Sequence, residues 1–267
     1  MSIGITQSSS STVLNSIKDV NTRTATLQQE LASNQNVLNP AQQGIVTRLS
    51  SQASGFTAAQ TNISKYQNVL GVTSTGLTSV ASLVTQLQTI ANSSNDPSVT
   101  AATAATNQKT FAALLKQIDT LSSSSQIDGV GLMGSTSTDI NVQSGITATD
   151  VTAMTAVPSD TTSLGINALD VSTAAGAATA IDSLNTALAT IAASQASIAS
   201  NQLSLTNTSA LDTSIAESLT KTITNITQPD AAKLQQELTQ LNTQQSINYW
   251  LMNQMNTQAQ NVLTLFR

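Results

Sequence analysis

The sequence contains no cysteine and no histidine. These absences exclude disulfide bonds, metal sites built from Cys and His, and nucleophiles that a histidine activates. Aromatic residues make up only 2% of the 267 residues and charged residues only 9%, whereas an enzyme pocket usually has aromatic walls and several ionisable groups. The 14 Asp and Glu residues are scattered rather than paired. We therefore expect neither an enzyme nor a bound cofactor or metal.

The shortage of charge also argues against nucleic acid and membranes as partners. Nine Lys and Arg residues are spread along a chain of net charge −5, so no basic patch is available for nucleic acid or anionic lipid. No apolar run reaches the length of a transmembrane helix, about 18 residues. The stretch 1–17 lacks a basic segment followed by an apolar run, so we expect no Sec signal peptide.

The sequence is rich instead in Ser, Thr, Asn, Gln and Ala, with aliphatic residues at an alternating spacing of four and three. This spacing is clearest from Pro229 to Arg267 and over residues 12–36. It places one narrow apolar seam along a helix, which is typical of a helix that pairs with another helix. We therefore predict that the two ends of the chain pair; the alternative for the first helix is an amphipathic helix on a globular core. The predicted seam residues are Val13, Ile17, Val20, Leu27, Leu31, Leu234, Leu238, Leu241, Met252, Met255, Val262 and Phe266.

The same spacing predicts three further helices between the helix-breaking Pro40 and Pro229, over residues 41–91, 99–121 and 174–226. The short connection between the first two makes them antiparallel neighbours. The first contains Gly55, Gly71 and Gly76. Since glycine destabilises a helix interior, these residues predict that another backbone packs closely against this helix.

Two regions depart from the helical spacing. The seam of the helix over 174–226 weakens at Ser209 and Asp212, which indicates a phase shift or a different neighbouring element. Helical spacing stops altogether in residues 122–170, where Asp139–Gln143 alternates like a strand. Short pieces around 150–157 and 166–171 could pair with that strand. We predict a small β excursion made mostly of turns and hairpins; the alternative is a disordered loop.

Together these elements predict a mainly α fold, a long antiparallel helical rod or coiled coil with a small β-hairpin excursion. We expect a discontinuous terminal coiled-coil domain of residues 1–40 and 229–267. A rod domain would comprise residues 41–228, with its β-hairpin region at about 128–171. A rod has a poor ratio of core to surface, so its uncharged surface is best covered by further copies of the same chain.

Three segments of the sequence resemble bacterial flagellins, the subunits of the flagellar filament. Leu31–Ile63 resembles the N-terminal conserved segment of the family, including Arg48, Gly55 and Asn62. Gln117–Met133 is similar to the segment that leaves the rod helix and enters the β-hairpin, and Gln260–Arg267 matches the C-terminal signature. Because the three segments occur in order along almost the entire chain, the resemblance is specific.

The chain also departs from the family pattern. Pro40–Gly44 stands where many flagellins have a pair of acidic residues, and Phe266 stands where Leu is commoner. The central segment is too short for the outer domains that many flagellins insert there, so the chain resembles a minimal form. The innate-receptor epitope of the family has Arg and Glu at its centre, whereas Ser79–Ala91 contains no charged residue. We therefore expect weak or no recognition by the flagellin receptor of animal immunity.

The resemblance implies a structural subunit that self-assembles into the extracellular flagellar filament for swimming motility. It implies secretion in an unfolded state through the flagellar type III export apparatus. Its partners would be other copies of the chain, hook-associated and cap proteins, and a flagellar export chaperone. The alternative within the superfamily is a hook–filament junction protein, which makes a short ring. A signalling helical bundle would need Glu-rich adaptation sites and usually a membrane segment, and both are missing.

A few polar residues occupy seam positions: Asn34, Gln52, Gln195, Gln245 and Asn248. Polar residues at such positions fix the register of a helix pair at some cost in stability. For Gln245 and Asn248 the alternative is that their amides face solvent or a filament channel.

Overall fold

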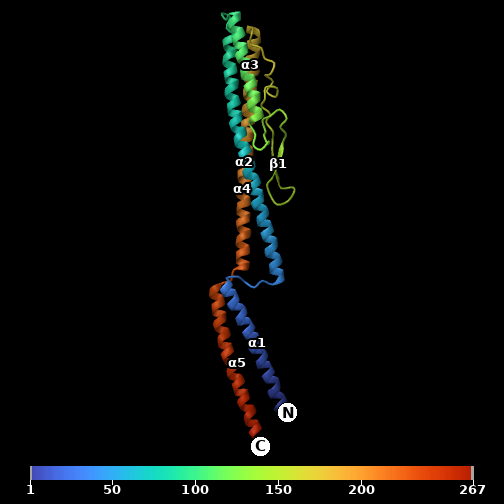
Figure 1. Cartoon of the computed structure of the whole chain (residues 1–267), viewed down its shortest axis with the longest axis vertical. Coiled ribbons are helices and arrows are strands. Elements are labelled where there is room, and N and C mark those ends of the chain that lie inside the picture. The colour runs from blue at the N-terminus through green and yellow to red at the C-terminus, as the bar shows by residue number, and fades with distance from the viewer. Residues whose placement is uncertain (1, 266–267) are drawn as a thin grey trace. The chain divides into compact units, whose positions relative to one another are not determined.

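The structure, a computed structural model, describes residues 2–265. Its described part contains five α-helices and two β-strands (Figure 1). They are α1 (Ser2–Ser33), α2 (Pro40–Ser94), α3 (Ala101–Ser124), β1 (Ile140–Gln143), β2 (Val151–Met154), α4 (Ala174–Thr227) and α5 (Ala231–Leu265). The predicted fold class, mainly α with long antiparallel helices and a small β-hairpin, is confirmed.

The chain divides into two compact units. One unit comprises the residues up to Ser51 and those from Ser218 onward, and the other comprises Gln52–Glu217. The divisions fall inside α2 and α4, several residues inward of Pro40 and Pro229. The first unit therefore contains α1, α5 and the adjoining ends of α2 and α4, and the second contains the remaining elements.

The paired helices of the second unit keep a strict seven-residue register. Three polar contacts join α2 to α4. From one contact to the next, the residue number on α2 rises by seven or twenty-one, and the residue number on α4 falls by the same amount. The contacts are Gln60 with Thr213 (2.8 Å), Gln67 with Thr206 (3.4 Å) and Gln88 with Asn185 (2.6 Å). A constant seven-residue step is the repeat of a left-handed coiled coil.

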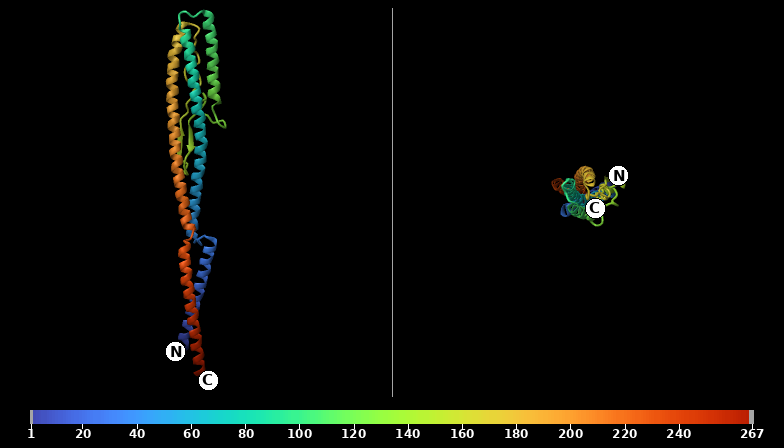
Figure 2. Two further views of the ribbon diagram at one scale, coloured as in Figure 1. Left: turned by 90° about the vertical axis from the view of Figure 1, so that its left-hand side faces the viewer. Right: turned by 90° about the horizontal axis from the view of Figure 1, so that it is seen from above.

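The buried side chains follow the same step of seven residues. In α2 the ladder is Ile63, Leu70, Leu77, Val84 and Ala91, all fully buried. In α4 it is Ala177, Leu184, Ile191, Ile198, Leu205 and Asp212, all at most 3% exposed. The third helix, α3, runs alongside these two (Figure 2) and adds the buried Phe111, Leu115 and Ile118. The core of this unit is therefore a row of layers along three helices, and buried residues of the segment 132–171 complete it.

Many hydroxyl side chains in the helices form hydrogen bonds within their own helix. Thr57, Thr61, Thr85 and Thr89 each donate to the carbonyl oxygen four residues earlier, at 2.9–3.1 Å. Such bonds remove the need for a partner outside the helix. They explain how a chain so rich in Ser and Thr remains helical over long stretches.

The helix ends fit their sequences. Pro40 is the first residue of α2, where its missing N–H costs nothing. Asn39 and Gln42 form a reciprocal capping box, with Oδ1 of Asn39 accepting from the Gln42 N–H at 2.9 Å and Oε1 of Gln42 accepting from the Asn39 N–H at 3.0 Å. Asp230 accepts from the backbone N–H groups of Ala232 and Lys233 at the start of α5.

The N-terminal helix differs from its prediction at both ends. It begins at Ser2 rather than near residue 12, because extending an existing helix is far easier than starting one. It ends at Ser33, where Asn34 takes a left-handed conformation (φ 52°) and the Gln35 N–H reaches the Glu30 carbonyl at 3.3 Å. This is a C-terminal capping motif. Asn34 therefore ends the helix, and the prediction that it fixes the seam register is wrong.

Strands β1 and β2 form an antiparallel hairpin in which Ile140 pairs with Met154 and Gln143 with Val151. The predicted strand at Asp139–Gln143 and the pairing piece around 150–157 thus occur. The predicted piece at 166–171 forms no strand: Asp160 caps one turn and Gly165 (φ 68°) makes another. These turns leave no extended backbone to pair, although Ile166 is buried in the core.

The glycines of α2 meet side chains rather than another backbone. An added Cβ at Gly55 would lie 2.8 Å from Cγ2 of Ile146 in the hairpin, and one at Gly76 would lie 2.6 Å from Sδ of Met133. An added Cβ at Gly71 would meet nothing within 4 Å. The expected close packing is therefore present at two of the three glycines, and the expectation of a neighbouring backbone is wrong.

The glycine pair gives a matched test. Gly71→Ala should raise the free energy of unfolding by about 0.5–1 kcal/mol, because alanine is the better helix former and has room. Gly76→Ala should lower it by about 1–2 kcal/mol, because overpacking against Met133 and Ser125 outweighs that gain. Urea unfolding of the two full-length variants, followed by circular dichroism, measures both effects. Equal stabilisation of both variants would contradict the packing at Gly76.

Candidate functional site

Helices α1 and α5 of the first unit pair in antiparallel orientation (Figure 1). Three side-chain contacts establish the direction, because the partner numbers on α5 rise as those on α1 fall. Arg23 contacts Glu237, Asn21 contacts Gln245 and Ser16 contacts Asn248. The first and last helices of the chain therefore form one joint structure, which neither could form alone.

Five of the predicted seam residues come together between α1 and α5. Val20, Leu27, Leu234 and Leu241 form one buried cluster, with Leu238 packed against it. Ile17 is also buried, at 8% exposed. Burying a side chain of this size stabilises by about 1.5–3 kcal/mol. Among the described side chains, this cluster is small for two helices of 32 and 35 residues.

The other predicted seam residues lie outside the cluster. Val13, Met252 and Met255 are half-buried. Leu31 is 37% exposed, and the antiparallel register places it level with the start of α5 at Ala231. Phe266 and the side chain of Val262 lie outside the described residues.

Two polar residues at the predicted seam positions of α5 bond to α1 and specify the register of the pair. Nε2 of Gln245 donates to Oδ1 of Asn21 at 2.6 Å, and Nδ2 of Asn248 donates to Oγ of Ser16 at 3.0 Å. Both α5 amides are half-buried and bonded to α1, as a role in fixing register requires. Gln52 and Gln195, the predicted polar positions in the second unit, are half-buried as well.

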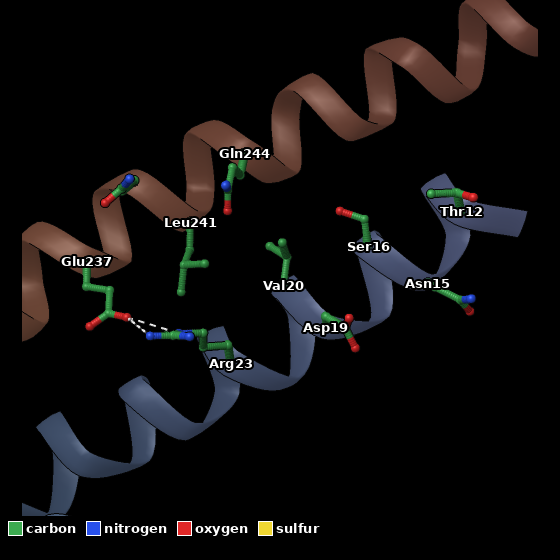
Figure 3. A pocket seen from close by; sticks show the side chains of 10 residues that line it. Thr12, Asn15, Ser16, Asp19, Val20, Arg23, Glu237, Leu241 and Gln244 are labelled. Carbon is green, nitrogen blue, oxygen red and sulfur yellow. Dashed lines mark hydrogen bonds and ion pairs between the residues drawn. The ribbon is translucent and has the colours of Figure 1, made fainter. Parts of the chain in front are cut away.

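Among the described residues, one ion pair is present, between Arg23 of α1 and Glu237 of α5 (Figure 3). Nε of Arg23 donates to Oε1 of Glu237 at 3.0 Å, and the guanidinium Nη2 contacts the same oxygen. The Arg23 side chain is 65% exposed, and exposed pairs contribute only about 0.2–1 kcal/mol. The pair therefore helps to set register more than it stabilises.

A groove of about 650 Å³ runs between the two helices beside the seam (Figure 3). Its lining residues are Thr12, Asn15, Ser16, Asp19, Val20, Arg23, Glu237, Gln240, Leu241 and Gln244. Amides and hydroxyls dominate, and within the described chain no group of three acidic side chains could hold a metal ion. The groove has the chemistry of a contact surface and lacks a nucleophile with its activating base.

The outward face of α5 carries apolar side chains that are not among the predicted seam residues. Ile247, Trp250 and Leu251 are 53%, 60% and 37% exposed. Their i, i+3, i+4 spacing places them on one face, and α5 has no charged residue beyond Glu237. The spacing was readable in the sequence, but it lies out of phase with the seam repeat. We call these three residues the α5 outer face.

None of the described helices combines the length and the apolar character needed to cross a bilayer.

Comparison with known proteins identifies the family. A Bacillus subtilis (strain 168) protein named "Putative flagellin YvzB" is 30% identical over 158 residues, which are 58% of this chain and 99% of that protein. The crystal structure of Bacillus cereus flagellin has the same fold, with a TM-score of 0.51 and 22% identity over 56% of this chain and 87% of that chain. No family model matches. The paired terminal helices, the hairpin and these similarities show that the chain belongs to the flagellin family, as a structural subunit rather than an enzyme.

Proposed function

We propose that this chain polymerises into the extracellular filament of the flagellum and that the α1–α5 pair is its assembly element. The α5 outer face carries this proposal. Ile247 and Trp250 are more than half exposed, on a helix segment without charge. Contiguous exposed apolar side chains mark protein–protein contact sites. Since a filament is made of one kind of subunit, the partner is another copy of the chain.

The weakness of the α1–α5 seam supports the same proposal. Among the side chains that the structure describes, five aliphatic residues are buried in this pair: Ile17, Val20, Leu27, Leu234 and Leu241. The two helices have 32 and 35 residues. Isolated helices gain little stability from propensity and depend on packing. Contacts with neighbouring copies would supply the missing burial. Folding of the terminal helices would then be coupled to polymerisation.

The discontinuous terminal domain follows from this coupling. Residues 1–40 and 229–267 would form the assembly domain, and residues 41–228 would form a body that folds in the free subunit. The seam and the α5 outer face lie on different sides of α5. The α5 outer face of one copy can therefore contact a different surface of the next copy. Heterologous contacts that do not close produce an open helical polymer.

Assembly outside the cell requires export, and the weak seam suits it. A subunit whose terminal helices fold only on assembly can pass through a narrow type III export apparatus unfolded. An export chaperone would cover the terminal segment beforehand. Hook-associated and cap proteins would meet the same helices at the two ends of the filament.

Substitution of the single tryptophan tests the proposal. Trp250→Ala should slow seeded elongation of purified protein by tenfold or more, because a buried aromatic anchor at an interface contributes about 2 kcal/mol or more. Leu203→Ala is the matched control, since Leu203 is 63% exposed on α4 of the other unit. Light scattering gives the rates, and electron microscopy shows the products. Elongation of Trp250→Ala at the unmodified rate would contradict the proposal, and growth that stops at short rings would favour the junction protein.

Weak recognition by the innate flagellin receptor is a further expectation. Segment 79–91 of α2 has no charged residue, and its Ser79, Thr85 and Thr89 hydroxyls donate to carbonyls of their own helix. Few groups remain free to bind a receptor. Reporter cells should respond to this protein far less than to an enteric flagellin at equal concentration. An equal response would overturn this expectation.

A further inference from the structure

The buried ladder of α4 ends on a carboxylate. Ile198, Leu205 and Asp212 follow one another at steps of seven residues, and Asp212 is only 3% exposed. Its Oδ2 atom is buried without a hydrogen-bond partner. The register between α2 and α4 is unchanged here, because Thr213 contacts Gln60. The weakening of the seam is therefore not a phase shift; it marks an ionisable side chain in a core position.

The tip of the β-hairpin packs against the helix pair near Asp212. Ile146 packs into the space left by Gly55 of α2. Asp150, in the same turn, accepts from the Thr147 N–H at 2.9 Å and is exposed. The negative charge of Asp150 acts on Asp212 and contributes to raising its pKa. Asp212 thus lies where α2, α4 and the hairpin tip come together.

No positive charge compensates Asp212. Between Arg48 and Lys65 the α2 sequence has no charged residue, and between Asp182 and Glu217 the α4 sequence has only Asp212. The hairpin segment 140–156 has only Asp150. The elements around Asp212 therefore present one like charge and no opposite charge.

This placement favours the protonated acid. Burial is the larger cause that raises the pKa of Asp212, and repulsion by Asp150 is the second. Hydrogen bonds from Thr147 lower the pKa of Asp150. As the pH falls, Asp212 therefore takes up a proton before Asp150 does. The pKa of Asp212 is higher in the folded chain than in the unfolded chain. The protonated acid therefore contributes its full stabilisation to the folded state when the pH is below the pKa of the unfolded chain. That effect is lost as the pH rises through the folded-state pKa.

We propose that Asp212 is a protonation switch for the docking of the hairpin tip onto α2 and α4. In the neutral form it fills a core position of the ladder, and the tip seats against Gly55. In the ionised form it is buried without a counter-charge and repels Asp150, so the tip and the adjacent turn of α4 open more often. The proposal concerns one subunit and does not depend on filament formation.

The test compares three full-length variants over a range of about pH 4 to pH 8. Asp212→Asn removes the charge with little change of shape, Asp150→Asn removes the repelling charge, and Asp182→Asn is a control at an exposed position of the same helix. The measurements are thermal unfolding and hydrogen exchange of amides 145–151, corrected for the intrinsic pH dependence of exchange.

In the unmodified chain the corrected opening of amides 145–151 should increase at least about threefold as the pH rises through the range. Asp212→Asn should abolish this increase and raise the melting temperature at neutral pH, Asp150→Asn should reduce the increase, and Asp182→Asn should leave it unchanged. The proposal is overturned if Asp212→Asn keeps the increase or is less stable than the unmodified chain at neutral pH. Since Asp150 is exposed, its variant does not disturb the core, and an unchanged increase in that variant also overturns the proposal.

Discussion

The seven-residue repeat is the constraint on which the rest of this structure depends. A straight α-helix has 3.6 residues per turn, so a buried stripe on long helices stays in contact only when the helices supercoil around a repeat of seven. In α2 and α4 that repeat holds from Ala91 and Ala177 at one end to Ile63 and Asp212 at the other. The polar contacts between α2 and α4 keep the same repeat, and so do the buried Phe111 and Ile118 of α3.

Amides and hydroxyls make most of the side-chain contacts that fix the register of the helix pairs, and Arg23–Glu237 adds one charged contact. Gln60, Gln67 and Gln88 each bond to an opposite side chain on α4, and Gln245 and Asn248 do the same on α1. Neutral hydrogen bonds are not screened by salt as surface ion pairs are. The chain has few charged residues, and most of the side-chain contacts between its helices are neutral hydrogen bonds.

The regular parts of the fold were predictable because their cause is local. Aliphatic spacing predicted all five helices, Pro40 and Pro229 marked the breaks, and alternation marked the strand at Asp139–Gln143. The mispredicted parts depend on tertiary contacts or on individual backbone conformations. Asn34 was assigned to the seam because spacing cannot detect a left-handed cap.

The same distinction applies to the candidate site. Val20, Leu27, Leu234 and Leu241 were predicted and form the cluster, whereas the predicted Leu31 is exposed. Trp250 and its neighbours were missed because they repeat outside the seam phase. The buried Asp212 required knowledge of which element covers α4.

Coupled folding and assembly of the terminal helices is the central claim, and hydrogen exchange of the unmodified protein tests it most directly. Amides of α1 and α5 should exchange rapidly in the free subunit and become strongly protected in the filament. Amides of the buried ladders in α2 and α4 should be protected in both states. Equal protection of α1 and α5 before and after assembly would contradict the claim.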